Sequence, residues 1–273
     1  MMEISQRVSP KLSQTSNNIF LNEKLLARVK SIYDKKEQLN LSTEDAKLLE
    51  DLYESFKANG ATLNKDDKEK YRKLSMDLSM LTLQFDQNAL KDKNRFELLI
   101  TDENELSGLP ESARDAAAML AKSKDKNGWL FNLSAPSYIP FMRYSDKRDL
   151  REKMYREYMS VGNKGDEFDN KDIIKKIVNI RLEIAQLMGF KNYAEYALEH
   201  TMAKNSANVY KLLNQLLEAY KPIAINEYNA VEGFALGTEK ENITVMPWDW
   251  SYYSEKLRDI RFKVNDEMTR PYF

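Results

Sequence analysis

Apolar residues recur every three or four positions over several stretches of this chain, which is the spacing of one face of an α-helix. The clearest stripe consists of Tyr71, Leu74, Leu78, Leu81 and Phe85. Similar stripes cover residues 170–188 and 206–236, and Pro222 is expected to kink the second of these helices. Weaker patterns predict further helices over residues 19–32, 43–60, 109–121, 146–160 and 249–262.

Capping residues set the expected ends of these helices. Ser42 followed by Asp45 resembles a capping box, and Gly60 is placed to end the same helix in a left-handed conformation. Asn64 is the expected N-cap of the helix that carries the clearest stripe, and Asp249 is the expected N-cap of the last helix.

Two short segments favour strands. Apolar and other residues alternate over 96–100, and the run WLFNL occupies 129–133, so the two are expected to pair as a small sheet. Pro136 and Pro140 are interpreted as the two sides of a short bend. The predicted fold is therefore mostly α, a multi-helix body with a small β patch. Residues 1–17 are polar and carry Ser, Gln and Asn, so we expect a loose leader there. Because no Gly/Ser/Pro linker divides the chain, we expect one helical body over residues 18–273.

Composition supports long helices and excludes several functions. The chain has 273 residues with only 8 Gly and 7 Pro, and its formal net charge is -1. This balance gives no electrostatic reason to expect nucleic acid or an anionic membrane as a partner. With 0 Cys there is no disulfide framework and no cysteine metal site. No signal-peptide or membrane-spanning segment is recognisable, so a cytoplasmic protein is expected.

The single histidine, His200, is the most restrictive feature of the composition. A His-Glu-x-x-His zinc site requires two histidines on one helix face, so this chain cannot build one by itself. A Ser-His-Asp triad would have to use His200 as its only base. We interpret His200 mainly as a structural or surface residue near a helix end, and we assign no catalytic, cofactor-binding or metal-ligating residue.

Aromatic residues gather before and within the last predicted helix, at Trp248, Trp250, Tyr252 and Tyr253. Such a cluster can line a groove for an extended ligand, because Trp and Tyr combine an apolar face with a polar tip. The alternative, which we favour, is a packed helix start that joins two layers of the fold.

Several stretches, in order along the chain, together resemble the thimet oligopeptidase/peptidyl-dipeptidase family of zinc metallopeptidases, most closely its bacterial peptidyl-dipeptidase branch. The most specific is IVNIRLEIAQLMGFKNYAEYALEHTMAKN, at 177–205. The others are NEKLLARVKSIYD at 22–34, LLEDLYESFKANGATL at 48–63, and the longer segments 96–112, 134–170 and 246–273. Each motif is weak alone, but as a set they cover the chain from about Phe20 to Phe273.

The resemblance implies a mostly α fold with two lobes beside a deep channel that admits short peptides. It also implies a zinc ion that activates water, with the Glu of the His-Glu-x-x-His motif as general base. No residue of this chain matches that motif, which in the family lies beyond the equivalent of Phe273. Relatives also carry more helices before the equivalent of Phe20, so we expect a fragment that is truncated at both ends and corresponds to much of the lobe opposite the zinc.

Three hypotheses follow. In the first, the chain is a non-catalytic piece of a zinc-dependent oligopeptidase and does not hydrolyse peptides alone. The four aromatic residues are then channel or lobe-interface candidates, and the surface that faces the missing catalytic lobe includes Tyr252, Tyr253, Phe262 and Phe273. In the second, the chain is an autonomous helical module that binds peptides or a protein. The third, a metal-independent hydrolase that uses His200, ranks lowest.

Overall fold

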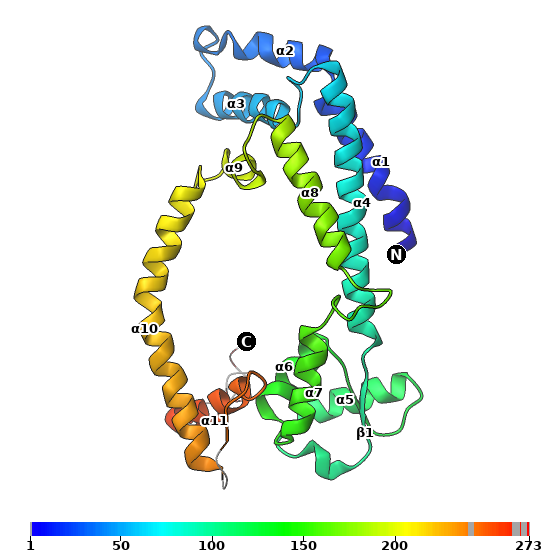
Figure 1. Ribbon diagram of the computed structural model, residues 1–273, viewed down its shortest axis with the longest axis vertical. Coiled ribbons are helices and arrows are strands. Elements are labelled where there is room, and N and C mark those ends of the chain that lie inside the picture. Colours follow the sequence, from blue (N-terminus) through cyan, green and yellow to red (C-terminus); the bar gives the residue numbers. More distant parts are fainter. Residues whose placement is uncertain (1, 240–242, 264–267, 269–271, 273) are drawn as a thin grey trace. The chain divides into compact units, whose positions relative to one another are not determined.

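The computed structural model describes residues 2–239, 243–263, 268 and 272 (Figure 1). Most of these residues are helical and one small sheet is present, as predicted. The chain divides into two compact units, one of residues 1–88 and 170–212 and one of residues 89–169 and 213–273, where the sequence predicted a single body. The chain passes from one unit to the other after residue 88, within the long helix α4, and after residue 212, within the long helix α10. At these two points no Gly- or Pro-rich linker marks the boundary.

The first unit is built from helices alone. Its elements are α1 (Met2–Phe20), α2 (Glu23–Tyr33), the 3-10 turn η1 (Lys36–Gln38), α3 (Thr43–Ala58), most of α4 (Lys65–Arg95), α8 (Lys171–Leu187), α9 (Tyr193–Leu198) and the start of α10 (Ser206–Thr238). Apolar residues of the predicted stripes form its interior. Tyr71 and Leu74 of α4 pack with Ile184 of α8, and Phe56 of α3 packs with Val29 of α2.

Helix α1 corrects the expectation of a loose leader over residues 1–17. Its polar side chains bond to α4, which lies beside it (Figure 1). The amide of Asn17 donates to the Ser75 hydroxyl at 2.9 Å, and the Gln6 amide donates to Gln87 at 2.8 Å. Asn17 is buried at this interface. The segment was interpreted as unstructured because it is polar. Its hydrogen-bond partners lie about 60 to 80 residues away along the chain, so no local pattern indicates them.

The caps predicted for the first unit are present. The Ser42 hydroxyl accepts from the backbone N–H of Asp45 at 3.1 Å, and Asn64 accepts from the N–H of Asp67 at 2.9 Å. Gly60 has φ +81°, a left-handed conformation in which a side chain is strained, and the N–H of Ala61 then closes on the Phe56 carbonyl. Local capping chemistry therefore fixed these helix ends.

The second unit holds the sheet and the largest core. Its elements are the end of α4, β1 (Leu98–Ile100), η2 (Glu103–Leu106), α5 (Glu111–Ser123), β2 (Trp129–Phe131), α6 (Ala135–Tyr144), α7 (Arg148–Met159), most of α10, and α11 (Trp250–Phe262). The two strands pair antiparallel with Leu98 opposite Phe131, which confirms the predicted patch. The core includes Phe131, Leu133, Phe141, Met154 and Trp248.

Helix α6 contains both Pro136 and Pro140, so the prediction of a bend between them is wrong. Pro136 lies at the helix start, where a missing N–H costs nothing. Pro140 lies inside the helix and removes one backbone hydrogen bond. The next two residues, Phe141 and Met142, are buried in the main core, and that burial offsets the loss. None of the described helices is both long and apolar enough to cross a membrane.

Candidate functional site

The aromatic segment is anchored in the second unit by Trp248, which directly precedes Asp249 and α11. Its indole ring is buried in the main core, 6.1 Å from the Tyr155 ring. The Arg156 guanidinium lies 4.9 Å from the centre of the indole ring, an attractive cation–π arrangement. Trp248 therefore packs the start of α11 onto α7.

Tyr252 and Tyr253 are also buried, and each hydroxyl donates to a carboxylate. Tyr252 donates to Asp146 at 2.8 Å, and Tyr253 donates to Glu239 at 2.6 Å. Burial, reinforced by these carboxylate acceptors, raises the pKa of both phenols above the ordinary value. Both tyrosines therefore remain protonated donors and are unsuited to act as general bases near neutral pH.

Trp250 is the one member of the group with substantial exposure, 38% of its surface. Its ring stacks on that of Tyr228 in α10, with 6.0 Å between centroids and 7° between planes. Of the four predicted residues, Trp250 alone presents a broad side-chain face at the surface. Whether any of the four contacts a peptide or another polypeptide stays a prediction.

The sequence did not reveal the charged group that these aromatics surround. Asp249 is fully buried, and it accepts from Arg151 at 2.8 Å and from Arg148 at 2.7 Å. The backbone N–H of Met246 also donates to it, at 3.1 Å. Asp249 lies at the N-cap position, as predicted, but its side chain bonds to these partners and makes no cap bond to α11.

The electrostatic balance of this group keeps Asp249 charged. Burial by itself raises the pKa of its carboxyl, but hydrogen bonds from Arg148, the Met246 amide and Arg151 outweigh that effect and hold the pKa below the usual range. Arg151 is only 1% exposed, and its guanidinium also lies 4.0 Å from the centre of the Tyr252 ring. The buried ion pair between Arg151 and Asp249 therefore positions α7 against the start of α11. The arginines' i, i+3 spacing on α7 was the only signal in the sequence.

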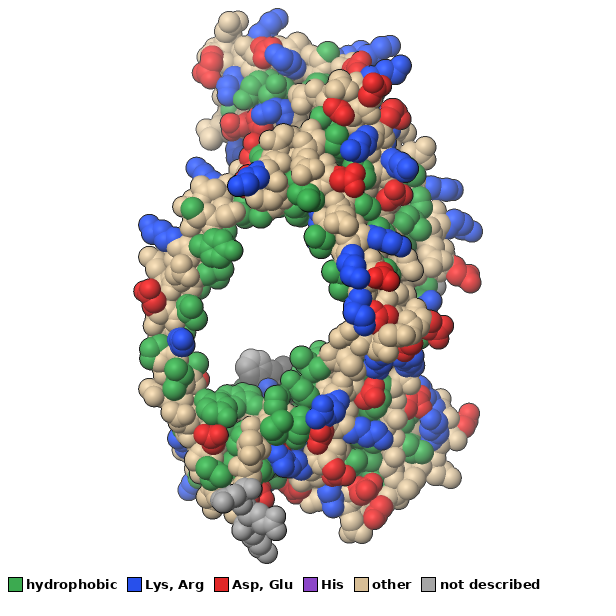
Figure 2. All heavy atoms as spheres, viewed as in Figure 1, with side chains coloured by type: hydrophobic (Ala, Val, Ile, Leu, Met, Phe, Trp, Pro, Cys, Tyr) green, Lys and Arg blue, Asp and Glu red, His purple; other side chains and the backbone are tan. Residues whose placement is uncertain are grey.

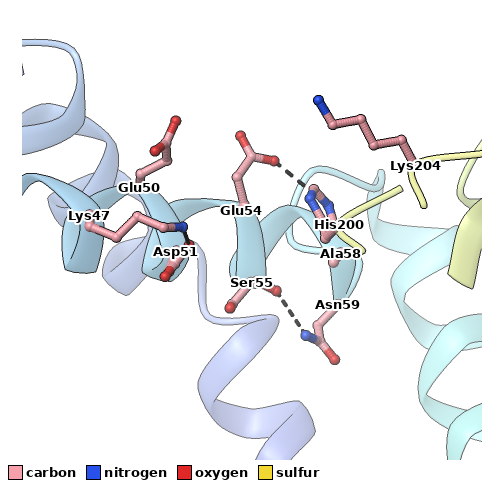
Figure 3. A pocket seen from close by; sticks show the side chains of 9 residues that line it. All are labelled: Lys47, Glu50, Asp51, Glu54, Ser55, Ala58, Asn59, His200 and Lys204. Atoms are coloured by element: carbon pink, nitrogen blue, oxygen red, sulfur yellow. Dashed lines mark hydrogen bonds and ion pairs between the residues drawn. The ribbon is translucent and has the colours of Figure 1, made fainter. Parts of the chain in front are cut away.

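His200 lies in the first unit, in a depression of about 790 Å³ beside α3 (Figure 3). Its Nε2 atom is 3.3 Å from the Glu199 carboxylate and 3.9 Å from the Glu54 carboxylate. Glu54 also pairs with Lys57 at 2.9 Å. Among the described residues the partners of the imidazole are thus carboxylates, with no hydroxyl nucleophile bonded to it. This arrangement favours a structural role for His200 between α3 and the end of α9.

The described residues do not fit a resident zinc ion. A protein zinc site needs at least three His, Cys, Asp or Glu ligands converging on one point. No such group of three occurs in the described part of the chain. His200 has carboxylates near one ring nitrogen, but they do not form a ligand set with it.

Exposed apolar side chains recur along α10 (Figure 2). Every residue from 210 to 229 is exposed. The helical spacing places Leu213, Leu216, Leu217, Tyr220 and Ile223 on one face of the helix. We call these five residues the α10 face. Elsewhere, Phe262 is 68% exposed, as the interface prediction requires, whereas Tyr252 and Tyr253 are buried and Phe273 lies outside the described residues.

A mostly helical peptidase is the class of protein that these sequence motifs and this fold suggest, and the comparisons with known proteins agree. Residues 141–273 match the model of Peptidase family M3. Oligopeptidase A from Salmonella typhimurium is 34% identical over 280 residues, an alignment that covers 100% of this chain and 41% of the relative. The Haemophilus influenzae oligopeptidase A is 35% identical over 279 residues.

A dipeptidyl carboxypeptidase from Escherichia coli strain K12 is 29% identical over 274 residues, covering 100% of this chain and 40% of the relative. The chain therefore belongs to peptidase family M3, the thimet oligopeptidase/peptidyl-dipeptidase family. It spans about two fifths of the length of the curated relatives that it matches.

Proposed function

We propose that this polypeptide supplies a non-catalytic, peptide-binding part of a zinc-dependent oligopeptidase that cleaves short peptides in the cytoplasm. The observation that carries the proposal is the alignment of the whole chain with oligopeptidase A at 34% identity. In this proposal the zinc ion and its ligands belong to polypeptide that this chain does not include. The chain's own residues bind and orient the peptide and exclude water from it.

The proposal includes inactivity of these 273 residues alone. Holding half of a peptide's contacts does not supply the charge stabilisation that the scissile bond needs, which comes from the reacting centre itself. Two observations support this part of the proposal. The chain has a single histidine, and no three metal-ligating side chains converge among the described residues.

The α10 face is the surface that we expect the catalytic part to cover. Most of the stability of a helix in a protein comes from the packing of its apolar face, and exposed apolar surface that is contiguous usually marks an interaction site. Trp250, stacked beside α10, and Phe262 extend the same expectation to α11. The autonomous binding module remains the alternative, because it too gives a partner to this surface.

The first test measures hydrolysis of quenched fluorescent peptides by the purified chain, with added zinc and with a chelator. We expect no turnover in either condition. Tight stoichiometric zinc with chelator-sensitive turnover would contradict the inactivity. Chelator-resistant turnover that is lost in His200→Ala would instead support the third hypothesis.

The second test mixes the chain with the part of Salmonella typhimurium oligopeptidase A that follows the aligned segment. We expect zinc-dependent turnover that neither polypeptide shows alone. The double variant Leu213→Asp/Leu217→Asp should need at least ten times more chain for half-maximal turnover, because it places charge on the α10 face. Asn214→Asp, on the polar side of the same helix, is the matched control. Peptide binding by the chain alone, with no restored turnover from any mixture, would favour the autonomous module.

A further inference from the structure

A second depression lies in the second unit. It has a volume of about 790 Å³ and lies among η2, the start of α5 and the start of α7. Cavities of this size accommodate small organic ligands. The lining residues that matter here are Glu103, Asn104, Ser107, Gly108, Arg114 and Lys147.

The two cations of this depression lack anionic partners among the described residues. Arg114 is partly buried, and its Nε atom is fully buried with no hydrogen-bond acceptor in the described part of the chain. Lys147 is likewise partly buried, and its ammonium group makes no ion pair with a described residue. The nearby Arg148 and Arg151 differ, because both bind Asp249.

A guanidinium Nε that is removed from water without an acceptor costs about 1–3 kcal/mol, and most buried polar atoms in proteins have a partner. An oxyanion can accept hydrogen bonds from the accessible part of a guanidinium, which balances its charge. A second cation in the same cavity raises the local positive potential further.

The wall of the depression is rigid. Leu106 and Leu109 are buried in the main core beneath it. The Ser107 hydroxyl donates to Asp146 at 2.7 Å. Gly108 has φ +83°, and a Cβ atom there would lie 2.1 Å from the Tyr144 carbonyl oxygen, so the chain approaches closely at this point. A wall fixed in this way is formed before a ligand arrives, which lowers the entropy cost of binding.

From the two unpaired cations in one preformed cavity, we infer that this depression binds an oxyanion, the carboxylate or phosphate of a small ligand. Arg114 grips the oxyanion through its guanidinium and Lys147 adds a point charge. The Glu103 carboxylate also lines the depression and opposes the binding of an anion there. This inference does not depend on the proposed peptidase function.

The test titrates the full chain with sodium acetate and, separately, with inorganic phosphate, and follows backbone amide resonances by NMR. Sodium chloride at equal ionic strength is the reference. We expect saturable shifts for residues around Ser107, Gly108, Arg114 and Lys147 with at least one of the two oxyanions. Saturation by acetate identifies a carboxylate site, and saturation by phosphate alone identifies a phosphate site; both support the inference.

Variants separate a specific site from general charge attraction. Arg114→Gln and Lys147→Gln should each weaken binding at least tenfold. Lys122→Gln on α5 and Lys153→Gln on α7 remove the same charge from exposed positions on the same helices and should leave binding unchanged. If Arg114→Gln fails to fold, Lys147→Gln still decides the question. Equal shifts with chloride, no saturation with either oxyanion, or equal weakening by the control variants would overturn the inference.

Discussion

Two neighbouring regions of the second unit are both rich in apolar and aromatic residues, yet one is interior and the other is surface. At the start of α11, Trp248, Tyr252 and Tyr253 are buried around the Asp249 ion pairs. Along α10, residues 213–229 are all exposed. The stacked rings of Tyr228 and Trp250 lie where the two regions meet. The comparison teaches that an apolar pattern identifies the face a helix will bury, whereas burial itself depends on a partner.

The largest expected effect in this comparison comes from Asp249→Ala. Removal of the carboxylate leaves the Arg151 guanidinium buried without an anion, which typically costs 3–5 kcal/mol, so we expect about that loss in the free energy of unfolding. Urea denaturation followed by circular dichroism measures it. Asp259→Ala, at an exposed position on the same helix, should change the free energy by less than about 0.5 kcal/mol. A small effect of Asp249→Ala would show that the ion pairs do not hold α7 and α11 together.

The same substitution made in both regions gives a direct contrast. Leu133 has no exposed surface, so Leu133→Ala should cost about 2–5 kcal/mol of unfolding free energy. Leu217 is 59% exposed, so Leu217→Ala should cost less than about 0.5 kcal/mol in the isolated chain. Thermal and urea unfolding of the two variants compare the losses. Equal losses at the two positions would mean that α10 is already covered within the isolated chain.

Acid should weaken the interior region and leave the α10 region unaffected. The folded pKa of Asp249 lies below its unfolded value, so its stabilising effect is complete above the unfolded pKa of about 4 and is lost as the pH falls through the folded pKa. Asp146, whose pKa is lowered by hydrogen bonds from Ser107, Tyr252 and Lys256 despite the opposing effect of burial, acts in the same direction.

Unfolding free energy measured from neutral pH to below pH ~4 tests this dependence. Asp249→Asn should flatten the acid-side decline, because the neutral amide has no carboxyl to protonate, whereas Asp259→Asn should leave the decline as it is. An unchanged slope in Asp249→Asn would contradict the assignment of the acid sensitivity to this carboxylate.

The smallest effect is expected at the boundary between the regions. A double-mutant cycle of Tyr228→Ala and Trp250→Ala should give a coupling free energy near the lower end of the ~0.5–1.5 kcal/mol that aromatic pairs contribute, because both rings are partly exposed. Unfolding of the wild type, the two single variants and the double variant provides the cycle. Additive losses would indicate that the stacked rings do not stabilise α10 against α11.

Local patterns were enough for much of the fold. The stripe from Tyr71 to Phe85 predicted α4, and Ser42, Gly60 and Asn64 predicted helix ends that the structure confirms. The alternating residues near Leu98 predicted the strand that pairs with the segment at Phe131. These features depend on neighbours within a few residues, so they can be recognised without the rest of the chain.

The candidate sites were harder to predict, because their contacts join distant parts of the chain. Asp249 meets Arg151 from 98 residues away. Arg114 of α5 and Lys147, the residue before α7, line one cavity. The helix over residues 2–20 was missed for the same reason, since its hydrogen bonds go to α4. No short-range spacing carries that information.

The sequence by itself determined the helical class, most helix boundaries, the family resemblance and the limits set by one histidine. Only the tertiary structure decided that the aromatic residues at the start of α11 surround a buried ion pair and that α10 keeps its apolar face at the surface. It also decided that Arg114 and Lys147 line one cavity without an ion pair to a described acid. The physical reason is that secondary structure follows from backbone and side-chain preferences along the chain. Burial and charge pairing follow from which surfaces meet, and that depends on the whole fold.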